Sequence, residues 1–258
     1  MTPIDRVKLF FKGIQDVAFL GWSACSGLFR RPWYGKETIE QMDLLGVGSV
    51  GIVVLTGLFA GMALAMQFSI ELSPFGAKGF LGRAVTVSIL RELGPVLTGL
   101  MVAGRVGSGV SAELGAMKVT QQIDAIQVLG SDPVKKLVVP RIVAVVVMLP
   151  ILTLISDLMG IGGGYSVAVF LSGMSSPAYW AGVGQGISFE NVVGGMAKPF
   201  VFGLIIALIG CYQGLGTTGG TKGIGKATTQ AVVVASILIL IANFLVTKLL
   251  VELFGWET

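Results

Sequence analysis

The sequence predicts an all-α membrane protein with five transmembrane helices, preceded by an N-terminal amphipathic interfacial helix. Two features of composition predict this class: 53% of the residues are hydrophobic and only 12% are charged, whereas soluble domains carry about 25% charged residues. The 38 glycines are a third feature, because helices in lipid pack through small residues that let their backbones approach. With so little polar surface available, much of the exterior must face lipid.

Residues that the sequence lacks also limit the function. There is no histidine, which excludes Ser-His-Asp and Cys-His nucleophilic sites and removes the commonest metal ligand. The two cysteines, Cys25 and Cys211, lie far apart in apolar stretches, where small buried hydrophobes are expected rather than a disulfide or a redox pair. We therefore expect no catalytic residue and no metal site in this chain.

Residues 1–40 form the first predicted domain, an interfacial helix followed by an elbow. Apolar residues from Ile4 to Leu28 recur at three- and four-residue steps, and charged residues occupy other positions. Such a basic amphipathic helix suits the cytoplasmic headgroup layer. Arg30, Arg31 and Pro32 are expected to break it before the first span. A signal peptide is not expected, because charges interrupt any apolar h-region.

Residues 41–258 form the second predicted domain and contain five apolar runs. A hydrocarbon core of about 30 Å needs about 20 helical residues. The third run is long enough for a hairpin, but a hairpin would move Lys222 and Lys226 outside, against the tendency of basic residues to stay inside. One span there puts the N-terminus on the cytoplasmic side and the C-terminus outside. The predicted spans cover about residues 44–68, 82–106, 140–172, 197–216 and 227–252.

The largest polar segment between spans covers residues 105–141 and is expected on the cytoplasmic side. Ser111 can cap a short helix that runs to about Leu129, and Gly130 with Pro133 ends it. The pattern alone leaves two interpretations open. The segment is either a solvated amphipathic loop helix or a docking helix for a cytoplasmic partner.

Arg91 and Glu92 lie inside the second apolar run, where burying a charge costs several kcal/mol unless the charge is paired or hydrated. Neighbouring residues on a helix do not face each other, so each is expected to need a partner on another helix or a water-filled cavity. Asp157 and Lys198 raise the same question. Lys198 can either snorkel at the outer boundary or meet an anionic headgroup.

The segment from Gly220 to Ala227 is similar to a phosphate-binding loop, but the similarity is superficial. It is one residue too short, has alanine at the hydroxyl position and follows no predicted strand. We therefore expect a short cytoplasmic turn there and no nucleotide binding. Small-residue spacing also marks candidate helix contacts at Gly57 and Gly61, Gly160 and Gly164, and Gly210 and Gly214.

Two stretches of the chain resemble a known family. From Arg91 to Arg141 the sequence reads RELGPVLTGLMVAGRVGSGVSAELGAMKVTQQIDAIQVLGSDPVKKLVVPR. This is similar to the signature of the MlaE/YrbE permeases, the membrane subunits of MCE-type ABC transporters that move phospholipids (the Mla system). GIGKATTQAVV, from Gly223, resembles the family's second signature at the start of the last span. The likeness covers nearly the whole chain, including the N-terminal helix and the number of spans.

The resemblance implies a permease subunit without catalysis of its own, located in the bacterial inner membrane. It further implies a homodimer that works with a cytoplasmic ABC ATPase, a periplasmic MCE-domain protein and, in many complexes, a STAS-domain protein. Phospholipid would pass between the inner membrane and the MCE-domain partner, which maintains outer-membrane lipid asymmetry. The ATPase would bind ATP with Mg, and this chain would bind no cofactor, metal or nucleic acid.

By the same resemblance, residues 111–129 correspond to the coupling helix that docks in a groove of the ATPase. The family usually has Glu-Gln where this chain has Gln121-Gln122, which leaves a hydrogen bond as the available replacement for an ion pair at Gln121. The implied contact residues are Glu113, Met117, Lys118, Gln121, Gln122 and Asp124.

In the family, lipid lies between the first spans of the two copies. The residues that match this region, and are expected to line it, are Gly61, Leu64, Gln67 and Phe68. Arg91, Glu92 and Lys198 are further candidates, either for shaping the cavity or for contacting the headgroup.

Two other classes of function remain as alternatives. An ion-coupled secondary carrier or channel would use Arg91, Glu92 and Asp157 without a partner ATPase, although neither half of the chain shows the internal repeat that many carriers have. A lipid enzyme embedded in the membrane would need clustered acid–base or metal-binding residues, which the scattered carboxylates do not provide.

Overall fold

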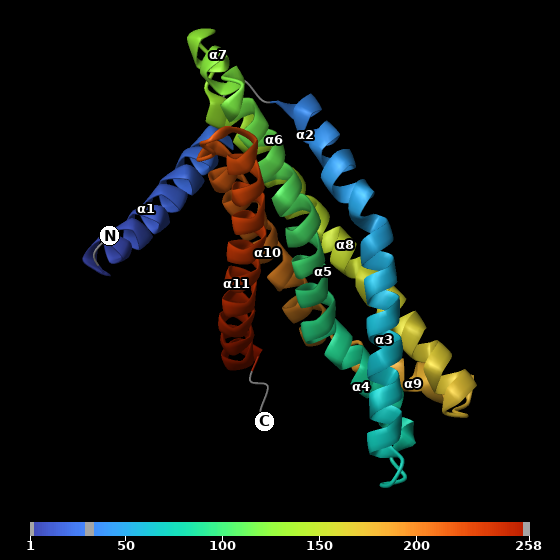
Figure 1. Cartoon of the computed structure of the whole chain (residues 1–258). Coiled ribbons are helices and arrows are strands. Elements are labelled where there is room, and N and C mark those ends of the chain that lie inside the picture. The colour runs from blue at the N-terminus through green and yellow to red at the C-terminus, as the bar shows by residue number, and fades with distance from the viewer. Residues whose placement is uncertain (1–2, 29–33, 255–258) are drawn as a thin grey trace. The chain divides into compact units, whose positions relative to one another are not determined.

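The computed structural model describes residues 3–28 and 34–254, and these residues form helices and turns without strands (Figure 1). Five helical runs are long and apolar enough to cross a membrane. The predicted class, an all-α membrane protein with five spans, is thereby confirmed. The runs are Gly35–Leu72, Lys78–Val119, Val134–Leu171, Phe189–Leu215 and Gly220–Leu253.

Each of the first three spans is built from several helical segments. The first consists of α2 (Gly35–Gln41), η1 (Met42–Gly46), η2 (Val47–Ser49) and α3 (Val50–Leu72). The second consists of η3 (Lys78–Phe80), α4 (Leu81–Ser88), η4 (Ile89–Leu93), α5 (Gly94–Val102), η5 (Ala103–Gly107) and α6 (Ser108–Val119). The third consists of η6 (Val134–Val138), α8 (Val139–Ser166) and η7 (Val167–Leu171).

The remaining helices are single segments. The fourth and fifth spans are α10 (Phe189–Leu215) and α11 (Gly220–Phe254). Outside the spans lie α1 (Pro3–Leu28), α7 (Gln122–Val128) and α9 (Ser176–Gly186). The segments η1, η4, η5, η6 and η7 are π-turns, a wide form of helix turn that is frequent at functional sites.

The packing divides the chain into two compact units. Unit 1 contains Met1–Leu45, Ala103–Val145 and Leu204–Ser236. In this unit α1 packs on η6 and α8, because a side-chain carbon added at Gly27 would lie 3.2 Å from Lys135. The buried side chains of this unit include Val106, Val110, Leu114 and Ile206.

Unit 2 contains Gly46–Val102, Val146–Gly203 and Ile237–Thr258. Its core joins α3, α4, α8 and α9 through small and aliphatic residues, among them Ala65, Leu81, Val85 and Ile161. Tyr179 of α9 is fully buried in this core and donates a hydrogen bond of 2.9 Å to the Ile161 carbonyl. Burial raises the pKa of the Tyr179 phenol above its ordinary range, so this hydroxyl stays a donor.

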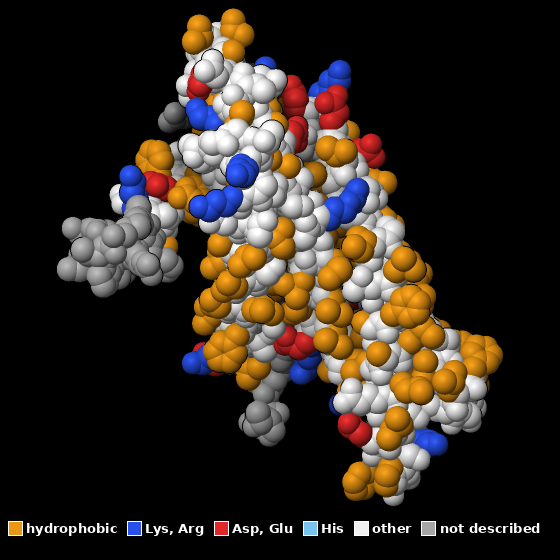
Figure 2. All heavy atoms as spheres, viewed as in Figure 1, with side chains coloured by type: hydrophobic (Ala, Val, Ile, Leu, Met, Phe, Trp, Pro, Cys, Tyr) orange, Lys and Arg blue, Asp and Glu red, His pale blue; other side chains and the backbone are white. Residues whose placement is uncertain are grey.

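Large apolar side chains cover much of the outer face of the span helices (Figure 2). Leu55 and Phe59 on α3, and Leu240 and Phe244 on α11, are each more than 50% exposed. Soluble proteins rarely expose contiguous apolar patches of this extent. These faces therefore fit a lipid surrounding, as the composition predicts.

The single helix predicted from Ser111 to Leu129 is wrong in two respects. Ser111 does not cap a helix, because it is buried inside α6, which continues the second span to Val119. The chain then breaks, since Gln121 adopts a left-handed conformation (φ 59°) before α7. The predicted end at Gly130 is confirmed: Gly130 has φ 76°, and the Ser131 amide donates to the Ile126 carbonyl.

Two further predictions concern the segment that follows α1 and the segment at the start of α11. Arg30, Arg31 and Pro32, which were expected to break the N-terminal helix, lie outside the described residues. The turn predicted from Gly220 to Ala227 is wrong, because this segment forms the first turns of α11. The turn instead precedes it, at Gly219, where φ is 85°.

Candidate functional site

The charged pair of the second span lies where the helix backbone has lost a hydrogen bond. Arg91 and Glu92 belong to the π-turn η4, and Pro95 follows in the first turn of α5. Proline has no N–H, so the carbonyl four residues before it, that of Arg91, cannot receive the usual helical bond. A buried carbonyl without a donor is costly, and another helix supplies the donor here.

That donor is Lys198 of α10, whose side chain is only 2% exposed. Its Nζ lies 2.6 Å from the Arg91 carbonyl oxygen and 2.7 Å from Oε1 of Glu92. Of the two alternatives for Lys198, snorkelling at the boundary does not fit this buried position, and contact with a headgroup stays a prediction. A buried ammonium is tolerated when it is both paired and hydrogen-bonded, and Lys198 meets both conditions.

Glu92 joins a third helix to this cluster. Asn243 Nδ2 and Thr247 Oγ1 of α11 each donate to the Glu92 carboxylate at 2.9 Å. One carboxylate thus accepts from an ammonium, an amide and a hydroxyl on two other helices. The expectation that each charge needs a partner on another helix is confirmed at Glu92.

Arg91 is held separately, at the end of α10 that follows α9. Its Nε donates to Oδ1 of Asn191 at 2.6 Å, and Asn191 Nδ2 donates to the Gly186 carbonyl at 2.7 Å. Asn191 is only 5% exposed, which fixes its orientation. We call the group of Arg91, Glu92, Asn191, Lys198, Asn243 and Thr247 the polar cluster; it lies entirely within unit 2.

Asp157 is buried but does not share in the hydrogen bonds of the polar cluster. Its side chain on α8 is 2% exposed, and it packs against Gly94, where a Cβ would overlap Oδ1. Among the residues that the structure describes, no donor reaches this oxygen. Because an unsatisfied buried oxygen costs free energy, Asp157 is the least well compensated acid of the spans described here.

The four residues expected to line a lipid path have different surroundings on α3. Gly61 is buried, since a Cβ there would overlap the Gly160 carbonyl of α8. Leu64 and Phe68 are half-buried against the core of unit 2. Gln67 is exposed, and its amide lies 3.2 Å from Glu71 Oε1 one turn later. The role of these four residues in lining a lipid path between two copies stays a prediction.

A cavity at the C-terminal end of α3 was not anticipated from the sequence. It has a volume of about 640 Å³, and its lining includes Ser69, Ser73, Lys78 and Ser172. The Ser69 hydroxyl donates to that of Ser172 at 2.6 Å. The signal that could have found it is the pair of serines one turn apart, followed by a lysine just beyond the span.

The predicted coupling residues lie on α6 and α7 in unit 1. Two of them form an ion pair with each other: Lys118 Nζ lies 2.9 Å from Asp124 Oδ1. Glu113 pairs with Arg141 of α8 at 2.7 Å, and the Arg141 side chain is only 4% exposed. Met117 is half-buried, whereas Gln121 and Gln122 are exposed.

Helix α7 also exposes an apolar tip that sequence reasoning missed. Val128, the last residue of α7, is 87% exposed, and Leu129, which follows it, is 82% exposed. Ile123 faces inward on the same helix and is buried. Helix α7 therefore presents polar and apolar side chains that contact little of their own chain.

Comparison with known proteins decides the family. The sequence profile described as "Permease MlaE" matches residues 38–249, which is most of the chain. The chain belongs to the MlaE permease family. A probable ABC transporter permease of Rickettsia conorii is 43% identical over 244 residues, covering 95% of this chain and 94% of that protein.

Two other relatives come from more varied organisms. The intermembrane phospholipid transport system permease protein MlaE of Haemophilus influenzae is 34% identical over 242 residues, covering 93% of each chain. Protein TRIGALACTOSYLDIACYLGLYCEROL 1, chloroplastic, of Arabidopsis thaliana is 37% identical over 241 residues, covering 93% of this chain and 69% of that protein.

Membership in the MlaE permeases and the chemistry of the described residues agree. Relatives named as permeases indicate a membrane subunit of an ABC transporter rather than a catalytic enzyme. Over the described part of the chain, no group of three or more Cys, Asp or Glu side chains lies together in a way that could hold a metal ion. The polar cluster joins three helices through one ion pair and several hydrogen bonds.

Proposed function

We propose that this chain is the membrane subunit of an ABC transporter that moves phospholipids between the bacterial inner membrane and a periplasmic MCE-domain partner. The observation that carries the proposal is the 34% identity, over 93% of both chains, with a permease named for intermembrane phospholipid transport. Such transport would maintain the lipid asymmetry of the outer membrane. The N-terminus would lie in the cytoplasm and the C-terminus in the periplasm.

A cytoplasmic ABC ATPase would dock on α6 and α7. The exposed Gln122, Asp124, Val128 and Leu129 support this assignment, because they offer a mixed polar and apolar surface, as protein interfaces do. The Glu113–Arg141 ion pair would transmit a movement of α6 to α8. ATP and Mg would be bound by that ATPase, and a STAS-domain protein would act on it rather than on this chain.

The lipid would pass along the first spans of two copies of the chain. The apolar outer face of α3 supports a second copy or lipid there, since Leu55 and Phe59 are more than 50% exposed. Gln67 and the serine-lined cavity near Lys78 offer polar contacts for a headgroup at the end of α3. In this proposal Arg91, Glu92 and Lys198 hold the helices around the path, because Lys198 is already paired.

The test is purification of the tagged chain in mild detergent from cells that express every candidate partner, followed by mass spectrometry of the copurifying proteins and lipids. We expect an ABC ATPase, an MCE-domain protein and phospholipid. A chain that emerges alone and free of lipid would contradict the proposal.

A secondary carrier is the second candidate, and one observation favours it. Asp157 is a buried acid with an oxygen that no described residue satisfies, and intramembrane acids often serve proton or ion pathways. Transport by the purified chain in vesicles, driven by an ion gradient without any ATPase, would establish the carrier. Transport that requires the ATPase and ATP would exclude it.

A further inference from the structure

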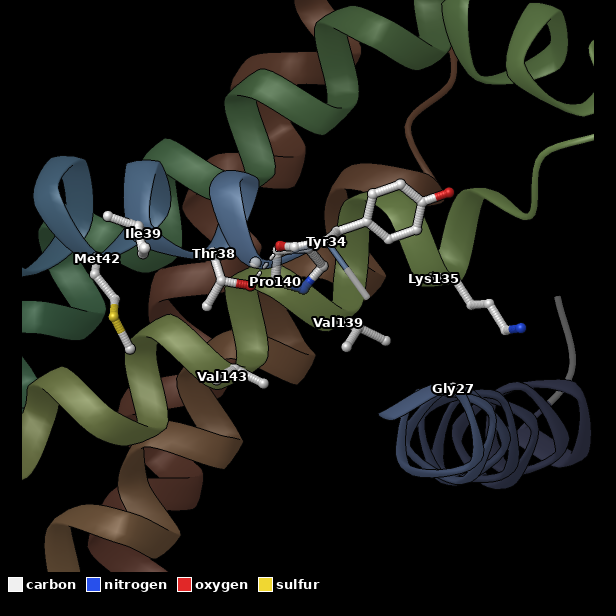
Figure 3. A pocket seen from close by; sticks show the side chains of 10 residues that line it. Gly27, Tyr34, Thr38, Ile39, Met42, Lys135, Val139, Pro140 and Val143 are labelled. Carbon is white, nitrogen blue, oxygen red and sulfur yellow. Dashed lines mark hydrogen bonds between the residues drawn. The ribbon is translucent and has the colours of Figure 1, made fainter. Parts of the chain in front are cut away.

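An apolar cavity of about 350 Å³ lies in unit 1, and it shares no residue with the polar cluster. Its walls come from the end of α1, from α2 with Tyr34 before it and Met42 of η1 after it, and from η6 with the start of α8 (Figure 3). The side chains that the following argument uses are Tyr34, Thr38, Ile39, Met42, Lys135 and Val143.

The two ends of this cavity differ in polarity. Figure 3 shows the Tyr34 hydroxyl and the Lys135 ammonium on one side, and Ile39 and Met42 on the other. Thr38 adds no polarity to the wall, because its hydroxyl donates to the Tyr34 carbonyl at 2.9 Å. The cavity thus has an apolar body and one polar end, which is the profile of an amphipathic ligand.

The cavity also lies at the beginning of two candidate membrane spans. Gly35 begins the first candidate span and Val134 begins the third, so both walls are the ends of membrane helices. Tyrosine and lysine are typical of the interfacial layer of a membrane, where their apolar bodies stay in the membrane and their polar tips reach water. Among the residues that the structure describes, no carboxylate lies within ion-pair distance of Lys135.

We infer that this cavity binds a phospholipid of the leaflet on the N-terminal side, as a fixed structural lipid and not as transported cargo. One acyl chain fills the space beside Ile39, Met42 and Val143, and the phosphate meets Lys135. A volume of 350 Å³ is at the low end of small-molecule sites and takes one chain rather than two. The bound chain would fill the space between α1 and the ends of the first and third spans.

The test uses phosphatidylglycerol that carries a photoreactive diazirine in one acyl chain. The full permease is reconstituted with its partners into vesicles of this lipid, irradiated and digested, and the labelled peptides are identified. We expect labelling of residues 34–42 and 135–143. Lys135→Glu should reduce that labelling by about fivefold, the loss expected when a charged contact at a partly wet site becomes repulsive.

Two matched controls keep the result interpretable. Lys36→Glu makes the same charge change on α2, at an exposed residue that does not line the cavity, and it should leave labelling within about twofold. Val143→Trp should fill the cavity and abolish the labelling, whereas Val147→Trp, one turn further along α8 and 41% exposed, should not.

Three results would overturn the inference. The first is labelling spread evenly over the apolar surface with none at the cavity. The second is an equal loss of labelling in Lys36→Glu and Lys135→Glu. That result would mean that the overall charge of the surface, and not a contact at Lys135, governs the labelling. The third is labelling of the isolated chain that disappears in the complex, which would mean that a partner's segment occupies the cavity. Failure of phospholipid transport itself would leave the labelling unchanged, so the two proposals fail separately.

Discussion

At the scale of single residues, a proline and a lysine on different helices solve one problem together. Pro95 leaves the Arg91 carbonyl without its helical donor, and Lys198 Nζ supplies a hydrogen bond of 2.6 Å. The same ammonium neutralises Glu92, which Asn243 and Thr247 also hold. The charges of the second span are therefore satisfied by the packing of three helices.

This arrangement predicts a large stability difference for Lys198→Met. The change leaves Glu92 without its cation and the Arg91 carbonyl without its donor, and we expect a loss of about 3 kcal/mol in the free energy of unfolding. That is the low end of the usual range, because the Glu92 side chain is 40% exposed. Thermal unfolding in detergent measures it.

The double variant K198M/E92Q gives the decisive comparison. It removes the charge together with its partner, so it should recover more than half of the loss, since a neutral amide costs less to bury than an unpaired carboxylate. Lys248→Met on α11 is the control, because Lys248 is exposed and should change stability by less than about 0.5 kcal/mol. No recovery in the double variant would show that the loss comes from the unsatisfied Arg91 carbonyl or from the packing of Lys198, and not from the Glu92 charge.

The sequence indicates which charges need partners but not which partners they find. Arg91 and Glu92 are conspicuous as charges in an apolar run. Their partners are about a hundred or more residues away, from Asn191 to Thr247, and such pairings depend on helix packing that no local pattern encodes. Asn243 and Thr247 are neutral, so nothing in a hydropathy pattern distinguishes them from other polar residues of a span.

At the scale of elements, α3 and α8 approach until their backbones touch. A Cβ at Gly57 would lie 2.5 Å from the Ser156 carbonyl, and one at Gly61 would overlap the Gly160 carbonyl. The glycine pair at this spacing was predicted to be a helix contact, and the structure confirms it for Gly57 and Gly61. The identity of the opposing helix was not predictable, since the spacing shows only that one face of the helix consists of small residues.

This contact predicts that Gly61→Val is strongly destabilising. The three carbon atoms of the isopropyl side chain cannot fit beside a backbone carbonyl, so α3 and α8 must separate, and we expect a loss of at least about 3 kcal/mol. Gly51→Val is a matched control on the same helix, because nothing lies within 4 Å of a Cβ there. The midpoint of thermal unfolding distinguishes the two variants. Equal midpoints would mean that the helices do not pack through Gly61.

The break between α6 and α7 depends on one residue in an unusual conformation. Gln121 has a φ of 59°, which β-branched residues adopt only at considerable cost. We expect Gln121→Val to destabilise the segment by about 1–2 kcal/mol, and Gln121→Gly to leave it unchanged or slightly more stable.

Hydrogen exchange of residues 116–129 measures this effect, because the opening is local. Gln122→Val is the control, since Gln122 is exposed at the start of α7 in ordinary helical geometry. Its cost should stay below about 0.7 kcal/mol. Faster exchange in Gln122→Val than in Gln121→Val would show that helix propensity, and not the left-handed residue, governs the break. The sequence could not show this break, because glutamine is an ordinary helix former.

At the scale of the whole molecule, the second span leads directly into α7, the segment proposed to dock a partner. The second span runs from Lys78 to Val119 without interruption of its helical character, and α7 follows after the break at Gln121. Hydropathy could predict the spans, since lipid selects for apolar residues over a set length. It could not predict the exposed tip of α7, because Val128 and Leu129 look like core residues in a sequence.

That tip gives a test of the proposed docking of an ABC ATPase on α7. Apolar side chains at the centre of an interface contribute most of its affinity, and Val128 and Leu129 are 87% and 82% exposed. The double change Val128→Asp with Leu129→Asp should therefore lower the amount of copurifying ATPase by about tenfold or more. Because both residues are exposed, the midpoint of thermal unfolding should stay nearly constant. Gln127→Asp, a charge added beside them on the same exposed helix, should retain most of the ATPase; an equal loss there would mean that charge near α7, and not its apolar tip, governs docking.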